Sequence, residues 1–343
     1  MHLCKLKTEN HQMRLPHRIY WIGIVALLIM SIASCKKTEE EEVTPESMSG
    51  NVVFDIPYYV QKGEIVTMSA SGIMTPKDAG YKWYITGLYS DTLRANTVTV
   101  QFPDSIGVFN VMATAFSLGY YTTVTSQQVT TIDTAWNTSL SGLEDATGYI
   151  VDERDGHAYG YVTVGDRDWF NQNLAWQGSG VPFKASPVTA GLFGSFYTWY
   201  EAVYEDVCPE GWSVPTAQDW EAFAAALGGK ELPFIDNWAG LGSKASAEAL
   251  LNGDRMWPYS PDNTHTNDVG WNAIPIGYTF SVSSPAEFQG MNKYGCWWSA
   301  TEKDDDQAFF RYIWYDLGDF PMSYTGKDDM RANVRCVRMH PQS

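Results

Sequence analysis

The feature that most restricts the fold of this chain is a series of short runs in residues 51–134 that alternate apolar and polar side chains. In one run, Val98, Val100 and Phe102 alternate with polar residues, which is the pattern of a strand with one buried face. Turn-forming residues separate the runs, and a segment of roughly 80 residues built in this way is expected to form an all-β sandwich. The predicted strands are 52–56, 65–70, 81–86, 97–102, 107–115 and 122–132.

Composition and charge exclude several classes of function. The 343 residues are 44% hydrophobic and 14% aromatic, which is enough apolar material for a folded core. With 23 basic and 40 acidic residues the formal charge is −17, and such a surface repels phosphate backbones, so no nucleic-acid partner is expected. Only His157, His265 and His340 lie beyond residue 34, which leaves little material for a histidine-based metal or acid–base centre.

The N-terminus has the organisation of an export signal. Basic residues precede an apolar run at Trp21–Ile32 of about twelve residues, which is too short for a transmembrane helix of about 20 residues. Residues 1–34 are therefore predicted to be a signal peptide. The string Ile32-Ala33-Ser34-Cys35 resembles a bacterial lipobox, which implies that Cys35 becomes the acylated first residue of the mature protein. The alternative is a simple signal peptide with Cys35 as an uninvolved thiol.

Residues 35–50 are charged and contain proline, so they cannot bury a core and are predicted to be a flexible acidic tether. The run Glu39–Glu42 resembles the acidic export signal of lipoproteins that reach the outside of the outer membrane. The expected location is the outer membrane, with the protein lipid-anchored and exposed at the cell surface. A periplasm-facing protein on an ordinary solvated tether is the alternative.

The rest of the chain is rich in tryptophan and glycine and shows helical periodicity. Short helices are predicted at 198–206 and after Thr216, which can cap a helix whose apolar residues Trp220, Phe223, Ala224 and Leu227 share one face. Strands are predicted at 296–301, 308–315 and 333–338. Between these lies a polar stretch, residues 252–292, which is either a functional loop or contains elements that the pattern does not reveal.

Two strings in the first segment, Tyr81–Tyr84 and Gly107–Val111, resemble the paired strands of a PKD or immunoglobulin-like module. The resemblance implies that residues 51–134 act as a spacer, with Trp83 in the core. The segment contains no cysteine, so an immunoglobulin-type disulfide is not expected.

A series of motifs runs through the second segment. They are Asp152–Tyr159, Val162–Trp169, Asn173-Leu174, Cys208–Pro215, Gly277-Tyr278, Trp297–Thr301 and Val334–Val337. In order and spacing they resemble the Fibrobacter succinogenes major paralogous domain, which we place at residues 135–343. The resemblance implies an α+β C-type lectin-like architecture, with two helices beside a small twisted antiparallel sheet and a long irregular loop region. It implies no particular activity.

Beyond Cys35 the chain contains Cys208, Cys296 and Cys336, an odd number for an oxidising compartment. The family resemblance implies a Cys208–Cys336 disulfide. Cys296 is then interpreted as a buried thiol in a strand, with a reactive or pairing cysteine as the alternative. Residues 211–220 and Arg335-Cys336 also resemble formylglycine-generating oxidases, but that chemistry needs two cysteines together in the active site, and Cys336 is assigned to the disulfide.

The polar stretch also supplies the candidate ligand-binding residues. They are Trp257, Tyr259, Asp262, Asn263, His265 and Asp268. Two aromatic rings among oxygen ligands suit stacking on a sugar or coordination of Ca²⁺. However, Trp271-Asn272-Ala273 has Ala273 where the strand motif of calcium-dependent lectins has aspartate. We therefore predict no metal or other cofactor, and Ca²⁺ remains the alternative.

No catalytic motif was found, and the acidic residues near Glu201 are interpreted as a solvated helix face. The sequence thus predicts a non-enzymatic, lipid-anchored binding or adhesion protein with a glycan or protein ligand. The alternatives are an enzyme that acts on envelope components or polysaccharides, and a purely structural surface protein.

Overall fold

The computed structural model describes residues 44–137, 140, 143–232, 236–280 and 287–341. The predicted signal peptide, Cys35 and most of the predicted tether lie outside the described residues. In the described part of the chain, no helix is both long and apolar enough to cross a membrane. Strands predominate over helices.

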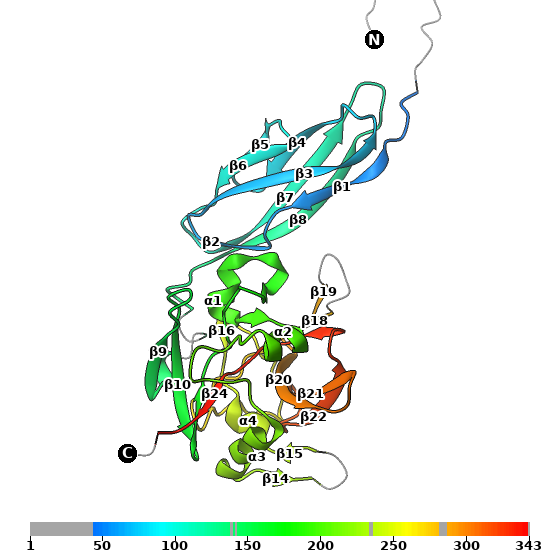
Figure 1. Ribbon diagram of the computed structural model, residues 1–343. Coiled ribbons are helices and arrows are strands. Elements are labelled where there is room, and N and C mark those ends of the chain that lie inside the picture. The colour runs from blue at the N-terminus through cyan, green and yellow to red at the C-terminus, as the bar shows by residue number, and fades with distance from the viewer. Residues whose placement is uncertain (1–43, 138–139, 141–142, 233–235, 281–286, 342–343) are drawn as a thin grey trace, which may run out of the picture. The chain divides into compact units, whose positions relative to one another are not determined.

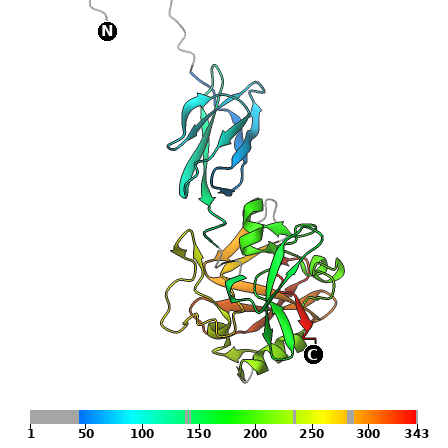
Figure 2. The same ribbon diagram turned by 90° about the vertical axis from the view of Figure 1, so that its left-hand side faces the viewer.

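The alternating runs of the first segment form two sheets that enclose one core (Figure 2). One sheet has the order β1-β3-β6 and the other β2-β8-β7-β4-β5. The strands are β1 (Ser49–Asp55), β2 (Tyr59–Gln61), β3 (Ile65–Thr75), β4 (Gly80–Ile85), β5 (Tyr89–Leu93), β6 (Thr97–Gln101), β7 (Gly107–Phe116) and β8 (Thr123–Ile132). All six predicted strands are present, and β2 and β5 are additional.

Trp83 lies at the centre of this first core, as predicted. Its side chain is fully buried, stacks on Phe54 with 5.7 Å between ring centroids, and donates from Nε1 to the carbonyl of Ala95 at 2.8 Å. The indole therefore fills the core and satisfies its own polar atom, which is the usual arrangement for a buried tryptophan.

In its described residues, the second segment contains four short α-helices among many strands (Figure 1). Both predicted helices form, and each begins with a capping box: Thr198 with Glu201, and Thr216 with Asp219. The second of these helices buries Trp220, as its periodicity predicted. The helices are α1 (Ala190–Phe193), α2 (Trp199–Tyr204), α3 (Ala217–Ala226) and α4 (Leu241–Ala245).

Two sheets organise this segment. The smaller has the order β24-β11-β10-β9, and the larger the order β19-β18-β20-β21-β22, with β23 also paired to β18. The remaining strands form short pairs. The bounds are β9 (Gly148–Val151), β10 (Ala158–Val164), β11 (Arg167–Phe170), β12 (Val181–Pro182), β13 (Ser195–Phe196), β14 (Lys230–Glu231), β15 (Trp238–Ala239), β16 (Leu250–Leu251), β17 (Asp254–Arg255), β18 (Ile276–Phe280), β19 (Glu287–Met291), β20 (Tyr294–Glu302), β21 (Gln307–Trp314), β22 (Met322–Gly326), β23 (Met330–Arg331) and β24 (Val337–Met339).

The polar stretch at 252–292 is not a single loop. It contains β17, β18 and β19, and β18 is an inner strand of the larger sheet. The sequence pattern did not predict β18, because glycine and tyrosine interrupt the alternation of its apolar residues. Gly277 has a φ of +74°, and a Cβ there would lie 1.9 Å from the carbonyl oxygen of Gln289, so this position requires glycine. This close approach lets β18 pair with β19 on one side and β20 on the other.

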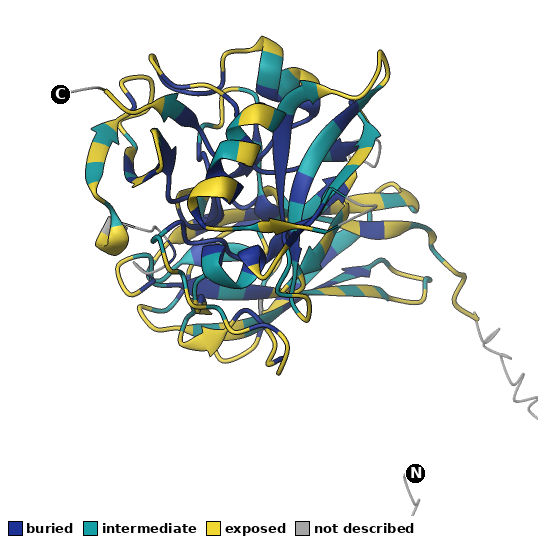
Figure 3. Cartoon of the chain, turned by 90° about the horizontal axis from the view of Figure 1, so that it is seen from below, coloured by how far each residue is buried: buried dark blue, intermediate teal, exposed yellow. Residues whose placement is uncertain are grey.

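The larger sheet separates two apolar cores (buried residues are dark blue in Figure 3). On β20, Trp297 enters one core with Trp220, Trp271 and Phe320, whereas Cys296 and Trp298 enter the other. The two side-chain directions follow from the two-residue repeat of a strand. The second core does not cover its whole sheet face, and the uncovered part forms the site described next.

Candidate functional site

An aromatic ladder crosses β20 and β21 on the face that carries Cys296. In the antiparallel register, Tyr294 lies opposite Trp314, Cys296 opposite Tyr312, and Trp298 opposite Phe310. Residues directly opposite one another in a sheet point to the same side. Three successive cross-strand pairs therefore place five aromatic rings and one thiol on a single face.

One end of this ladder is covered and the other is open. Trp298 is fully buried and donates from Nε1 to the carbonyl of Tyr197 at 2.7 Å, under the segment that leads into α2. Tyr294, Tyr312 and Trp314 are only partly buried. They border a cavity of about 590 Å³, which we call the aromatic groove. Its aromatic lining is Tyr278, Phe280, Tyr294, Phe310, Tyr312, Trp314 and Tyr324.

The groove offers neutral hydroxyl groups among aromatic rings. Burial raises the pKa of Tyr294 to about 12 and raises the pKa of both Tyr278 and Tyr312, so these hydroxyls stay protonated at neutral pH. Ser323 and Thr325 add two more hydroxyl groups to the lining. Of the described lining residues, Asp316 is the one with a charged side chain at neutral pH. The groove therefore suits a neutral ligand that has both apolar surface and hydroxyl groups.

Cys296 lies in the groove lining between these tyrosines. It is 2% exposed, and complete burial raises the pKa of its thiol well above the ordinary value. The thiolate is the nucleophilic form, and burial favours the protonated thiol at neutral pH. The interpretation of Cys296 as a buried strand thiol is confirmed.

The candidate ligand-binding residues of the polar stretch occupy different environments. Trp257 is 1% exposed and stacks on His265, with 4.7 Å between ring centroids, so its ring packs in the core and is not accessible to a sugar. Asn263 is 3% exposed and donates to the carbonyls of Trp314 and Tyr315. Tyr259 is 79% exposed. Asp262 and Asp268 are also exposed.

This stretch contributes to the site indirectly. The hydroxyl of Ser243 donates to the side-chain oxygen of Asn263 at 2.8 Å, and the amide nitrogen of Asn263 donates to the two carbonyls at the end of β21 at 3.3 Å each. It thereby fixes the backbone of Trp314, which borders the groove. Asn263 is thus placed as a positioning residue, whereas Trp257 belongs to a core and the half-buried His265 stacks on it.

His265 should make the stability of the protein depend on pH. Burial, and then the charge of Arg255, lower its pKa from 6.5 to about 4. The folded state therefore favours the neutral imidazole ring. The contribution of the neutral ring to the free energy of unfolding is complete above pH 6.5 and is lost as the pH falls from 6.5 towards 4. The full shift would correspond to about 3 kcal/mol, and because the ring is only half-buried and solvent screens it, we expect about 1–2 kcal/mol to be lost over this window.

The test compares urea unfolding of wild type and His265→Phe between pH 7 and pH 4. Phenylalanine can keep the stacking on Trp257 but cannot titrate, so the variant should lose less stability than wild type as the pH falls. Equal losses in the two proteins would contradict the prediction.

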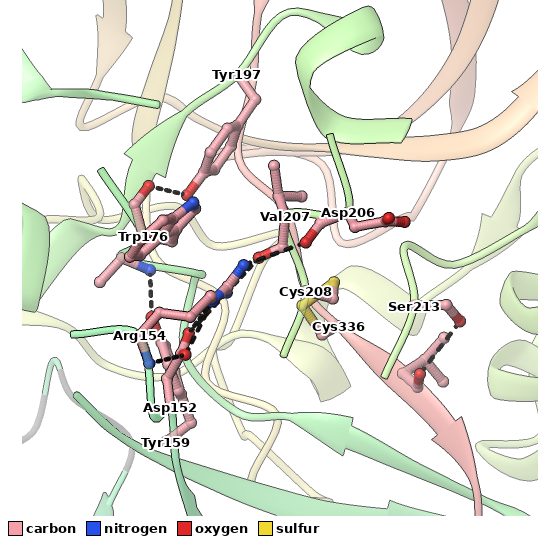
Figure 4. The surroundings of a disulfide bond; sticks show 12 residues. Asp152, Arg154, Tyr159, Trp176, Tyr197, Asp206, Val207, Cys208, Ser213 and Cys336 are labelled. Carbon is pink, nitrogen blue, oxygen red and sulfur yellow. Dashed lines mark hydrogen bonds and ion pairs between the residues drawn. A yellow bond between two sulfur atoms is a disulfide. The ribbon is translucent and has the colours of Figure 1, made fainter. Parts of the chain in front are cut away.

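The Cys208–Cys336 disulfide is present, as the family resemblance implied (Figure 4). Next to it, Arg154 binds both carboxylate oxygens of Asp152 and donates to the carbonyls of Asp206 and Val207, the two residues before Cys208. Its guanidinium also lies 4.3 Å from the ring centroid of Trp176. Asp152 and Arg154 therefore hold the chain in place at the disulfide.

The described residues include no group of three or more His, Cys, Asp and Glu side chains arranged to hold a metal ion. The expectation of no cofactor, and the alternative of a Ca²⁺ site, both stay predictions.

Sequence patterns could have indicated the aromatic groove. Tyr294, Cys296 and Trp298 alternate along one run, and Phe310, Tyr312 and Trp314 along the next. Alternation predicts that each set shares a face, but the pairing of the two sets depends on a register that a single sequence does not contain.

These features define a predominantly β protein with a disulfide-bonded C-terminal domain and an aromatic groove on one sheet. Residues 162–338, more than half of the chain, match the Fibrobacter succinogenes major domain. The chain belongs to this family. Comparisons with curated proteins and with solved structures find no match.

Proposed function

We propose that this protein is a non-enzymatic, lipid-anchored binding protein of the outer membrane surface, and that its C-terminal domain binds a glycan in the aromatic groove. The lipobox-like string at Cys35 and the acidic run that follows it support the anchor and the location. In this proposal residues 51–134 are a PKD or immunoglobulin-like spacer, supported by the two-sheet sandwich. The C-terminal domain is C-type lectin-like, supported by its helices beside antiparallel strands and by its long-range disulfide.

The observation that carries the glycan proposal is the aromatic ladder of the groove. A pyranose ring has a face of C–H groups that can pack on an aromatic ring, and hydroxyl groups around its edge. Tyr312 and Trp314 offer partly exposed rings, and the neutral hydroxyls of Tyr278, Tyr294 and Ser323 offer hydrogen-bond partners nearby. A cavity of about 590 Å³ also falls within the range of small-ligand sites.

The groove favours binding over hydrolysis. Glycoside hydrolysis generally uses two carboxyl groups that flank the scissile bond, and Asp316 is the one carboxylate among the described residues that line the groove. Glu201, the acidic residue considered from the sequence, is occupied: its carboxylate accepts from the backbone N–H of Thr198 and pairs with Arg331.

The test is a glycan array probed with the purified protein and two alanine variants. Trp314→Ala removes a ring that borders the groove and is expected to weaken binding of any glycan recognised by wild type at least about tenfold, equivalent to about 1.4 kcal/mol. Tyr259→Ala is the matched control, because it removes an exposed ring of the polar stretch that lies outside the groove lining. Its affinity should stay within about twofold of wild type.

The opposite ranking would place the ligand at the polar stretch and contradict the groove. Melting temperatures of both variants exclude unfolding as the cause of lost binding. Turnover of an array glycan by wild type would contradict a non-enzymatic protein, and a complete lack of glycan binding would overturn the glycan proposal.

A further inference from the structure

One end of the sandwich carries large apolar side chains that face solvent. Leu118 is 98% exposed, Met74 67% and Tyr121 58%. Single exposed apolar residues are common on protein surfaces, but a cluster of them at one end indicates contact with another apolar phase. We call this end, formed by residues 44–49, 74–79 and 117–122, the apolar tip.

Backbone pairing holds these three segments together. The N–H of Glu46 donates to the carbonyl of Gly119 at 2.9 Å, and the N–H of Tyr121 donates to the carbonyl of Glu46 at 2.8 Å. Three residues later, Ser49 at the start of β1 pairs with Thr75 at the end of β3. Met74 and Tyr121 therefore lie beside the same short segment, with which the described chain begins.

Leu118 stands at the corner of a tight turn. The N–H of Tyr120 donates to the carbonyl of Ser117 at 3.3 Å, and Gly119 has a φ of +81°. Proline or a polar residue usually occupies such a corner, because the side chain there points into solvent. A leucine with 98% exposure at this position contributes nothing to the core of the sandwich.

We propose that the apolar tip rests in the interfacial layer of a lipid bilayer, with Leu118 inserted and Tyr121 at the headgroup level. The contact would orient the sandwich on the membrane. Leucine favours the acyl region, and tyrosine favours the interface, where its ring is in an apolar environment and its hydroxyl is hydrated. The inference rests on the acylated Cys35 of the proposed function.

The length of the tether supports a bilayer as the partner. Ten residue steps separate Cys35 from Pro45, so the acylated residue can lie at most about 35 Å from the start of the sandwich. The apolar tip is the end of the sandwich joined to this tether, so the anchor maintains a high local concentration of lipid there.

Charge also permits the contact. The apolar tip contains Glu46, Lys77 and Asp78, a net of one negative charge, although the whole chain has a formal charge of −17. An anionic lipid surface would therefore repel this end less strongly than most of the molecule.

The test places one environment-sensitive bimane label on the acylated protein in vesicles of phosphatidylethanolamine and phosphatidylglycerol. Leu118→Cys labels the apolar tip, and Ser105→Cys is the matched control in the exposed turn between β6 and β7, at the opposite end of the sandwich. Other thiols do not interfere, because Cys208 and Cys336 are bonded and Cys296 is buried. Both label positions are exposed, so neither substitution should disturb folding.

On vesicles, the label at 118 is expected to shift to shorter wavelength, to become several-fold less accessible to aqueous iodide, and to be quenched by spin-labelled lipid. The label at 105 should remain aqueous. If both labels remain aqueous while mass spectrometry shows an acylated Cys35, the membrane contact is overturned and the anchor stands. If Cys35 carries no acyl group, the proposed membrane contact and the proposed lipid anchor both fail. Glycan binding in the groove is tested separately by the array.

Discussion

Replacing Arg335 with methionine is expected to lower the free energy of unfolding of the C-terminal domain by about 4 kcal/mol, because it removes hydrogen bonds from several buried acceptors. The guanidinium is completely buried. It donates to the side-chain oxygen of Asn173 and to the carbonyls of Phe170, Trp271 and Asn272. Methionine keeps much of the volume but donates to none of these oxygens. The oxygen of Asn173 keeps its hydrogen bond from Trp297, whereas a buried carbonyl left without a donor costs about 1–3 kcal/mol.

The environment of Arg335 explains how a buried cation is tolerated there. The described acceptors are neutral oxygens, and the guanidinium also lies 4.5 Å from the ring centroid of Trp271 and 5.9 Å from that of Trp297. Burial lowers the pKa of Arg335 well below its usual range. The carbonyl and amide oxygens and the two indole rings thus stabilise the guanidinium in the place of a carboxylate. These contacts of Arg335 join β11 and the segment around Trp271 to the last part of the chain.

Arg255→Met is the matched control for this prediction. Arg255 pairs with Glu248 at the surface, with side chains 51% and 58% exposed, and such a pair contributes roughly 0–1 kcal/mol. Urea unfolding followed by tryptophan fluorescence measures both variants. If Arg335→Met unfolds at the same urea concentration as Arg255→Met, the network around Arg335 does not stabilise the domain.

The sequence predicts those parts of the fold that depend on local patterns. Alternation predicted the strand that contains Val98 and Val100, and capping residues predicted the helix that begins after Thr216. Each of these signals is formed by residues only a few positions apart in the sequence. The strand β2 escaped prediction because three residues cannot display a clear period. The strand β5 escaped because its three central residues, Ser90, Asp91 and Thr92, are all polar and show no alternation.

The candidate site could not be predicted because it depends on contacts distant in sequence. A tryptophan among polar residues suggested that Trp257 was exposed, yet the neighbouring polar groups bind one another: Asn267 and Asn272 share two hydrogen bonds, and Asn263 binds the end of β21. With its polar groups satisfied, the stretch can cover the core and bury Trp257. The groove instead requires Tyr294 to lie opposite Trp314, a register that only the folded sheet defines.

The Cys208–Cys336 disulfide should give the second large effect. It links residues 128 positions apart, and in chain-entropy terms closing a loop of this size stabilises a domain by about 4–5 kcal/mol. The double variant Cys208→Ala/Cys336→Ala is therefore expected to lose about this much unfolding free energy. Cys296→Ala is the matched control, because it also replaces a buried cysteine but breaks no cross-link, and its loss should stay near about 1 kcal/mol.

Reduction separates the cross-link from the packing of the two sulfur atoms. Cys336 is fully buried and Cys208 is 9% exposed, so a thiol reagent must wait for local opening, and reduction of the native protein should be slow and should accelerate in urea. Once reduced, wild type should unfold at nearly the urea concentration of the double variant, whereas reductant should leave the double variant unchanged. A reduced wild type that keeps its full stability would show that Arg154 and the strand pairing at Val337 hold this region without the disulfide.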